Sequence, residues 1–528
     1  MEKRVVIAVI LSIAVLYGYS LIFPPVKKME AVKPAPATQG QAVPTQAVAV
    51  QPPSGPVISR ETSTARDIVV ETDLYTAVFS TRGAALKKLV LKRYKETSGA
   101  SGRNVVLLNE EPAENFSLIT DGKSFGIEPS AVYATSSSGL SLTGNGKGTL
   151  EFVAGSPSGL VCKKVYTFNG NGYRIDLHQE LLNSAAARFD GSLHLIVNNR
   201  IEAKPGDGRF EVYGSVTLAD NKLNTEKVAE FEKGPKQYQN NILWTAFADK
   251  YFMSAVLSEN SSIAAVRLAK GGVNYLRSDI TSPPIALNPG QSVAIDYRIF
   301  YGPKDLEILK GQGNRLEEVI DFGWFSALAK PLLYTLKFFY SYTHNYGIAI
   351  IIITVILKLL FFPLTHKSYK SMKEMQKIQP KMAELKEKHK NDRDAMNRSV
   401  MELYKTHKVN PLGGCLPMVV QIPVFFALYK ALMFSIELRH APFMLWIMDL
   451  SAKDPYYVTP IIMGVTMFVQ QKMTPSSMDP VQAKMMLMLP VVFTFMFLNF
   501  PSGLVLYWLV NNILTIAQQA YINKSLPA

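Results

Sequence analysis

The chain has 528 residues, of which 48% are hydrophobic and 19% are charged, and its formal net charge is +14. Its two cysteines, Cys162 and Cys415, lie in different regions without metal-ligand spacing, which argues against a disulfide framework and a zinc site. Outside one helical hairpin, the sequence has no compact basic patch with interleaved aromatic residues. This argues against specific nucleic-acid binding. The excess of Lys and Arg is instead expected in the cytoplasmic loops of a membrane protein.

Residues 1–23 predict an uncleaved transmembrane anchor. Lys3 and Arg4 precede an apolar run that exceeds the roughly 7–15 residues of a signal-peptide core, and no A-x-A cleavage site follows it directly. The basic end places the N-terminus in the cytoplasm. Residues 24–55 are rich in Pro, Ala, Gln and Val and lack aromatic residues, so they predict a flexible linker.

Residues 56–304 predict an all-β sandwich. Short segments alternate apolar and polar residues with a period of two, and turn residues separate them. Asn169–Gly172 (NGNG) indicates a hairpin, because Asn and Gly tolerate positive φ. Strands without helices between them favour an antiparallel sandwich. Because it follows the anchor, this domain is expected outside the cytoplasm. The predicted strands are Asp67–Glu71, Tyr75–Ser80, Ala84–Leu91, Leu160–Phe168, Tyr173–Leu182, Gly191–Val197, Ile263–Ala269 and Gln291–Phe300.

One strand of this domain carries four charged or titratable residues on a single face. A spacing of two makes neighbours of Arg174, Asp176, His178 and Glu180. They could form a catalytic or metal site, but the simpler interpretation is a solvated face opposite an apolar one. The sequence shows no serine elbow or other enzyme signature. We therefore expect no enzymatic activity, no cofactor and no metal.

Residues 305–345 predict an amphipathic helix at the membrane interface. Aromatic residues accompany Lys330 and Lys337, which suits a helix lying in the interface rather than spanning the bilayer. We expect Pro331 to kink or restart this helix. The alternative is an ordinary packed linker helix.

Residues 346–364, YGIAIIIITVILKLLFFPL, predict transmembrane helix 2, since about 20 apolar residues cross a bilayer. Lys358 interrupts this run, and a lysine at mid-membrane costs roughly 2.5–3.5 kcal/mol on insertion scales. Such a group usually faces a watery cavity or a polar partner. Alternatively, Lys358 snorkels to the surface, because it lies only about 9 Å along the axis from Leu364.

Residues 365–411 predict a basic helical hairpin in the cytoplasm, interrupted at Pro380, with Asn391 and Asp392 available to cap its second helix. An apolar seam follows helical spacing between lysine-bearing faces. It could receive varied apolar partners, because thioether side chains are flexible, or it could simply close the hairpin on itself. The methionines of this seam that we select as candidate contacts are Met372, Met375 and Met382.

Residues 412–528 predict transmembrane helices 3–6. The expected spans are Leu416–Ser435, Tyr456–Gln470, Met485–Phe500 and Leu504–Tyr521. Counting the crossings places the hairpin and the C-terminus on the side of Lys3 and Arg4, so topology and basic residues agree. The chain is thus predicted to be a polytopic α-helical membrane protein with a large β domain outside the cytoplasm, and it ends without a long basic tail.

Several polar residues fall inside these spans. Thr354 lies one turn before Lys358, on the same face. Such groups either hydrogen-bond between helices or line a hydrated groove around Lys358. A cation without any Asp or Glu in a core span favours the groove. Its other candidate residues are Gln421, Trp508, Asn511, Asn512, Thr515 and Gln518.

Three segments are similar to the YidC family of membrane protein insertases, in its Gram-negative bacterial form. These are KVNPLGGCLPMVVQIPVFFALY (Lys408–Tyr429), APFMLWIMDLSAKDPYY (Ala441–Tyr457) and FPSGLVLYWLVNN (Phe500–Asn512). The resemblance implies insertion of newly made proteins into the inner membrane, alone or beside the Sec translocon. It also implies cytoplasmic termini and a periplasmic sandwich that resembles sugar-binding enzymes without their activity.

The resemblance further implies a positively charged, hydrated groove that opens to cytoplasm and lipid and is closed towards the periplasm. Lys358 matches a position where many members carry arginine, and Thr354, Gln421 and Trp508 match groove or substrate-contact positions. The hairpin matches the element that receives substrates and targeting factors. The implied partners are nascent membrane proteins, Sec components, the lipid bilayer, the ribosome and the signal recognition particle pathway. A ribosome contact through a long basic tail is not expected here.

Two other functions remain open at this point. A small-solute or ion transporter could use Lys358 as its binding site, although the core shows no inverted repeat. A membrane-anchored, carbohydrate-active enzyme could instead use the β domain.

Overall fold

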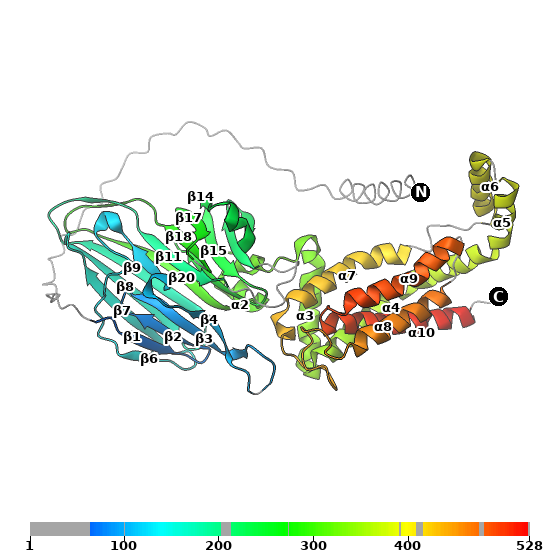
Figure 1. Cartoon of the computed structure of the whole chain (residues 1–528), viewed down its shortest axis with the longest axis horizontal. Helices are drawn as coiled ribbons and strands as arrows, with labels where there is room; N and C mark the ends of the chain where they lie inside the picture. The colour runs from blue at the N-terminus through cyan, green and yellow to red at the C-terminus, as the bar shows by residue number, and fades with distance from the viewer. Residues whose placement is uncertain are drawn as a thin grey trace. The chain divides into compact units, whose positions relative to one another are not determined.

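The computed structural model describes residues 64–99, 101–201, 213–272, 274–389, 392–407, 416–474 and 480–525. The predicted anchor (1–23) and linker (24–55) lie outside these residues. The described chain is all-β from residue 67 to residue 303, here called the β domain, and helical from there on (Figure 1). The predicted fold class, an all-β domain followed by a helical region, is confirmed.

An eight-stranded antiparallel sheet, in the order β13-β12-β15-β16-β20-β9-β8-β7, is the largest layer of the β domain. Alternate residues of each long strand face the core, as in β8, where every second side chain from Leu160 to Phe168 is buried. The strands are β7 (Lys147–Gly155), β8 (Leu160–Asn169), β9 (Arg174–Asn183), β12 (Gly214–Ala219), β13 (Lys222–Lys227), β15 (Ile242–Ala248), β16 (Phe252–Ser258) and β20 (Ser292–Pro303).

Two five-stranded sheets pack on this sheet. The Phe79 ring lies 4.7 Å from that of Tyr166, and Gln179 Nε2 donates to Thr120 Oγ1 across 3.2 Å. One sheet has the order β4-β3-β2-β1-β6, with β1 (Asp67–Glu71), β2 (Tyr75–Ser80), β3 (Ala85–Lys95), β4 (Asn104–Asn109) and β6 (Gly139–Ser141). The other has the order β14-β17-β18-β11-β5, with β5 (Ile119–Asp121), β11 (His194–Arg200), β14 (Lys236–Gln239), β17 (Ala265–Lys270) and β18 (Tyr275–Thr281).

The smaller elements complete the domain. Strands β10 (Phe189–Gly191) and β19 (Ile285–Leu287) form a two-stranded ribbon, and η1 (Ala113–Asn115), η2 (Lys123–Phe125) and η3 (Val228–Lys233) are short 3-10 helices. The β1–β6 pair is parallel, so the prediction of a purely antiparallel sandwich is wrong at this edge.

The predicted hairpin at Asn169–Gly172 joins β8 to β9, but not for the reason given by its sequence. None of these four residues adopts a positive φ. Instead, Gly170 lies so close to a neighbouring loop that a Cβ atom there would be 2.8 Å from the Gly144 carbonyl oxygen. Close backbone approach, rather than a left-handed turn, therefore requires glycine at this position.

The charged face of β9 pairs with itself and with β20. Arg174 Nε lies 2.5 Å from Asp176 Oδ1, and His178 Nδ1 lies 2.7 Å from Asp296 Oδ1, all on exposed side chains. Ile175 and Leu181 are buried on the opposite face. This arrangement supports the interpretation of a solvated surface.

Lys164 is a buried amine inside the β domain, at a core position of the alternating pattern of β8. Its side chain is fully buried, and Nζ donates to the carbonyl oxygens of Leu118 at 2.7 Å and Gly83 at 3.2 Å. Burial lowers the pKa of Lys164 from its usual 10.5 to about 7, because the charged form loses its hydration.

We expect the stability of the β domain to rise with pH above 7 because of Lys164. Between pH 7 and 10.5 the unfolded chain binds the proton and the folded chain does not, so the unfolding free energy should rise by about 1.4 kcal/mol per pH unit. Lys164→Met should flatten this slope. This pH slope is measured in a Cys415→Ala chain by how readily a thiol reagent modifies the buried Cys162 at increasing urea concentrations. The modification rate is corrected for the thiolate fraction at each pH. Equal slopes in both proteins would contradict the prediction.

The segment predicted as one interface helix consists of several shorter elements. They are α2 (Leu306–Gln312), η4 (Leu316–Val319), η5 (Gly323–Phe325) and α3 (Ser326–Thr343). Gly313, with φ of +76°, ends α2, so the prediction of a single helix over 305–345 is wrong. Pro331 lies inside α3, which continues through it instead of restarting. Helix α3 buries Leu333 and exposes the aromatic side chains of Phe338 and Tyr342.

Lys337 of α3 joins three segments of the chain. Its Nζ lies 3.0 Å from Asp305 Oδ2, at the start of α2, and 2.6 Å from Glu437 Oε1, in η7 (Ile436–Leu438). Burial alone would lower the pKa of Lys337, but the two carboxylates outweigh it and hold the pKa above its usual value. The ion pairs therefore keep this lysine charged.

The remaining helices are α4 (Tyr346–Lys377), α5 (Gln379–Lys388), α6 (Arg393–Thr406), α7 (Leu416–Phe434), α8 (Val458–Met473), α9 (Pro480–Phe497) and α10 (Ser502–Ser525). Helix α4 is continuous over 32 residues, so the predicted boundary between residues 364 and 365 is not a helix end. The chain breaks before Pro380, and Asp392 caps α6, as predicted. Helix α10 packs against α8 and α4, and α3 packs against α4 and α7.

The helical region exposes many large apolar side chains and buries several polar ones among its apolar core. Large apolar side chains such as Leu360, Val465 and Val492 are exposed, whereas Asn512 and Gln519 are buried. Among the described helices, Tyr346–Lys377 has the length and composition to cross a membrane, and Val419–Phe434 and Met485–Phe497 are shorter apolar stretches. A surface of this kind is suited to lipid rather than water.

Candidate functional site

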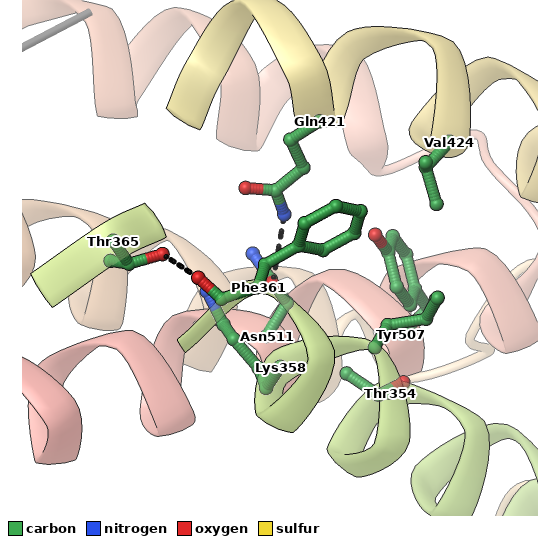
Figure 2. Close-up of a pocket in the computed structure, with 9 residues that line it drawn as sticks. Thr354, Lys358, Phe361, Thr365, Gln421, Val424, Tyr507 and Asn511 are labelled. Carbon is green, nitrogen blue, oxygen red and sulfur yellow. Dashed lines mark hydrogen bonds between the residues drawn. The ribbon is translucent and has the colours of Figure 1, made fainter. Parts of the chain in front are cut away.

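A pocket between α4, α7 and α10 brings together several of the predicted groove residues. It encloses about 380 Å³ of empty space, including the part that is open to solvent. Figure 2 shows polar and apolar side chains converging on it from the three helices. Its lining residues are Thr354, Leu357, Lys358, Phe361, Thr365, Gln421, Val424, Tyr507 and Asn511. Four of the predicted groove residues, Thr354, Lys358, Gln421 and Asn511, are among them.

Helical spacing places one row of α4 side chains in this pocket. Thr354, Lys358, Phe361 and Thr365 follow each other at intervals of four, three and four residues. The hydroxyl groups of Thr354 and Thr365 donate to the carbonyl oxygens one turn earlier, at 2.7 and 2.9 Å. The oxygen atoms of these two hydroxyl groups therefore remain available to accept hydrogen bonds from other donors.

Lys358 is half-buried in the pocket. Among the described residues, no carboxylate lies close enough to pair with its ammonium group. A lysine on an apolar helix without an acidic partner must be stabilised by other polar groups or by water. The pocket around Lys358 supplies amide and hydroxyl groups from all three helices.

An amide pair bridges the pocket between α7 and α10. Gln421 Nε2 donates to Asn511 Oδ1 across 3.1 Å (Figure 2). Val424, one turn after Gln421, continues the wall formed by α7. The two amides keep further donors and acceptors for other partners, because each has more hydrogen-bonding groups than this one contact uses.

Tyr507 is a lining residue that sequence reasoning missed. It lies four residues before Asn511 on α10, and this spacing places both on one face of the helix. The same spacing that was applied to Thr354 and Lys358 could have identified it.

Trp508, Asn512, Thr515 and Gln518 were predicted to line the groove, but the structure does not place them in the lining of this pocket. The Trp508 ring lies 4.8 Å from that of Phe425 and 5.1 Å from that of Phe497, within an aromatic cluster. It thus packs α10 against α7 and α9.

Residues of the polar stripe of α10 face another helix. Asn512 Nδ2 donates to Thr466 Oγ1 at 3.4 Å, and Gln519 Nε2 donates to the Met473 carbonyl oxygen at 2.6 Å, both on α8. Thr515 donates to the Asn511 carbonyl oxygen within α10, and Gln518 is buried. Consecutive residues of a helix point about 100° apart, so neighbouring residues of the stripe face different helices. One stripe therefore serves both the pocket and the α8–α10 contact.

The hairpin methionines differ in their accessibility. Met382 is 6% exposed, and its sulfur accepts a hydrogen bond from the Tyr404 hydroxyl at 3.3 Å, so it closes α5 on α6. Met372 and Met375 are half-buried on α4. Met401 on α6, which we did not select, is exposed. The structure thus favours a hairpin-closing role for Met382 and leaves Met401 as an accessible thioether.

The loop between α7 and α8 covers the other end of the helices. Phe443 lies against Gly347 at the start of α4, where a Cβ atom would approach its ring to 2.0 Å. Asn345 Nδ2 donates to the Phe443 carbonyl oxygen at 2.8 Å, and the Gly503 amide donates to the Leu450 carbonyl oxygen at 2.9 Å. The loop is thereby fixed to the first turns of α4 and α10.

Asp454 organises the end of this loop. Its buried carboxylate accepts hydrogen bonds from Trp446 Nε1 at 3.1 Å, from the Tyr456 amide at 2.9 Å, and from the Thr459 amide and hydroxyl at 2.8 and 2.6 Å. Burial alone would raise the pKa of Asp454, but these hydrogen bonds hold it below the usual value.

We expect Asp454→Ala to destabilise the helical region by at least about 3 kcal/mol, because several buried donors lose their acceptor at once. Thermal unfolding of the detergent-solubilised protein, followed by helical circular dichroism, measures the loss. Lys453→Ala, at the exposed neighbouring position, is the matched control and should change little. Unfolding of Asp454→Ala at the wild-type temperature would show that the carboxylate does not hold the loop.

Comparison with known proteins covers both regions. The family described as YidC periplasmic domain matches residues 67–335, and the family described as 60Kd inner membrane protein matches residues 338–528. The membrane protein insertase YidC of Geotalea uraniireducens (strain Rf4) is 80% identical over 528 residues, covering 100% of both chains. That of Geotalea daltonii is 66% identical over 530 residues, also covering 100% of both. A solved structure described as an active YidC insertase is 19% identical, with a TM-score of 0.36, and the match covers 85% of this chain and 91% of that one.

Proposed function

Because the chain belongs to the YidC family of membrane protein insertases, it inserts newly made proteins into the inner membrane, and we propose that the Lys358 pocket receives the polar flank of the incoming segment. One observation carries this proposal: an ammonium group without a carboxylate partner among the described residues lies in a pocket lined by amides and hydroxyls. Such a site suits a polar or acidic visitor that must leave water.

In the proposed mechanism, the flank enters the pocket from the cytoplasm. Lys358, Gln421 and Asn511 replace part of the hydration that the flank loses, which lowers the barrier to crossing. The apolar part of the substrate then moves into lipid along the exposed apolar faces of the helices. Its burial supplies the driving force, at about 25 cal/mol per Å² of apolar surface.

The amide pair has a specific place in this mechanism. The hydrogen bond between Gln421 and Asn511 joins two walls of the pocket, so α7 and α10 are linked while it persists. We assign the pair to a resting state in which the two amides satisfy each other. An incoming backbone takes over these hydrogen bonds, and the walls part.

The topology that accompanies this mechanism is also a proposal. It comprises an anchor (1–23), a linker (24–55), a periplasmic β domain, cytoplasmic termini and a cytoplasmic hairpin formed by the end of α4, α5 and α6. The hairpin would meet targeting factors, the ribosome or Sec components, and its exposed lysines such as Lys370 and Lys377 support an anionic partner. The loop that caps α4 and α10 supports closure of the pocket on the periplasmic side.

Reconstitution tests the proposed function. Purified protein in lipid vesicles should insert a single-span protein synthesised in vitro, and a photoreactive group near the pocket should cross-link to that protein. The same vesicles distinguish the alternative, in which Lys358 binds a small anion. Accumulation of a small anion, without insertion or nascent-chain cross-links, would favour a transporter instead.

A further inference from the structure

Residues 443–448, in the loop between α7 and α8, carry an exposed apolar tip that the proposed function does not use. Met444, Leu445 and Met448 are 51%, 76% and 63% exposed. Three large apolar side chains gathered on six residues of a loop are unfavourable in water. Their grouping points to an apolar surrounding.

The tip is held in shape by its own backbone. The Phe443 amide donates to the Ile447 carbonyl oxygen at 2.9 Å, and the Ile447 amide donates to the Met444 carbonyl oxygen at 3.1 Å. Between them, Leu445 has a φ of +53°, which a bulky side chain seldom adopts. A strained residue with an outward apolar side chain, in a loop tied to α4 and α10, is typical of a functional position.

The surroundings of the tip have the composition of a membrane–water interface. Trp446 lies within the tip and donates to Asp454, and Tyr456 and Lys453 are exposed nearby in the chain. Trp, Tyr and Lys are the residues that anchor proteins at this depth. Further along the chain, Tyr456 and, in the first turn of α8, Ile461 are also exposed. The tip is thus followed, a few residues later in the chain, by the surface already assigned to lipid.

We propose that residues 443–448 form a lipid-binding wedge, in which Met444, Leu445 and Met448 insert into the outer leaflet of the bilayer. Because the same loop caps the first turns of α4 and α10, the wedge fixes the periplasmic seal of the pocket at a set depth. The occupant is lipid rather than protein, since interfacial residues border the patch in the chain and the lipid-facing surface of α8 follows it. The inference rests on the membrane location of the helices and not on the role of Lys358.

Site-directed spin labelling in proteoliposomes tests the wedge. Nitroxides are placed one at a time at Leu445 and Met448 in a full-length Cys162→Ala/Cys415→Ala chain. Leu360, exposed on α4, and Asn171, exposed in the β8–β9 turn, are the lipid and water references. Labels on the wedge should favour oxygen over a water-soluble nickel complex, as at Leu360, at a depth of about 5–10 Å, as found for interfacial segments. Accessibility like that of Asn171 overturns the proposal.

A second variant separates the apolar side chain from the loop shape. Asn tolerates a positive φ, so Leu445→Asn keeps the backbone conformation and removes the apolar group. A nitroxide at Met448 should then move towards the water reference, and an unchanged depth overturns the proposal. Spectral broadening at Met448 that disappears on dilution with unlabelled protein would show that a second copy covers the patch, which also overturns it. Insertion through the Lys358 pocket is measured separately and can fail without affecting this result.

Discussion

Lys358→Ala is expected to reduce the insertion of substrates with acidic flanks by about tenfold or more. Two opposite charges 4 Å apart attract each other by roughly 4 kcal/mol at an effective dielectric constant of 20, and the open side of the pocket weakens this through solvent. If about 1.4 kcal/mol of this attraction remains in the transition state, its loss lowers the rate about tenfold. Lys358→Arg keeps the positive charge and should retain most of the insertion.

The measurement is the insertion rate of matched single-span substrates that differ only in an acidic or neutral flank. The acidic substrate should lose more than the neutral one. Lys524→Ala removes an exposed lysine of α10 outside the pocket and is the matched control. If Lys358→Ala inserts both substrates at the wild-type rate, the charge has no part in the mechanism.

Cross-linking positions 421 and 511 is expected to stop insertion almost completely. The mechanism requires the contact between Gln421 and Asn511 to open, and a covalent link keeps α7 beside α10. Cysteines at both positions, in a Cys162→Ala/Cys415→Ala chain, are joined by a short reducible bis-thiol reagent. Insertion should fall after cross-linking and recover after reduction.

The contact between Thr466 and Asn512 offers a control for this experiment. It joins α8 to α10 by a similar polar pair outside the pocket, so the same cross-link there should leave insertion intact. Full insertion by the protein linked at 421 and 511 would show that these walls need not part.

Much of the β domain could be predicted because the alternation of apolar and polar residues along a strand is a local property of the sequence. Strands such as β1 and β8 coincide closely with their predicted segments. Lys164 could not be placed from its own strand, because it occupies a core position where a hydrophobic residue is expected. Its partners, Gly83 and Leu118, are 81 and 46 residues away, and only the packed sheets bring their carbonyl oxygens to the amine.

The pocket was partly predictable for a similar reason. Thr354, Lys358 and Asn511 follow from helical spacing and from the high cost of unpaired polar groups in lipid. The sequence does not determine how far α10 is turned about its axis, since packing against α4 and α8 determines that rotation. This is why Tyr507 lines the pocket while Trp508, the next residue, enters an aromatic cluster.

Photo-cross-linking to a stalled nascent chain shows whether substrates enter the pocket of Lys358. A photoreactive amino acid is placed at Val424, which lines the pocket, at Leu360, which faces outwards on α4, or at Met463, which is buried on α8. We expect adducts between position 424 and the polar flank of the substrate, and none from position 463. Adducts from position 360 without any from position 424 would mean that substrates pass along the lipid face and bypass the pocket of Lys358.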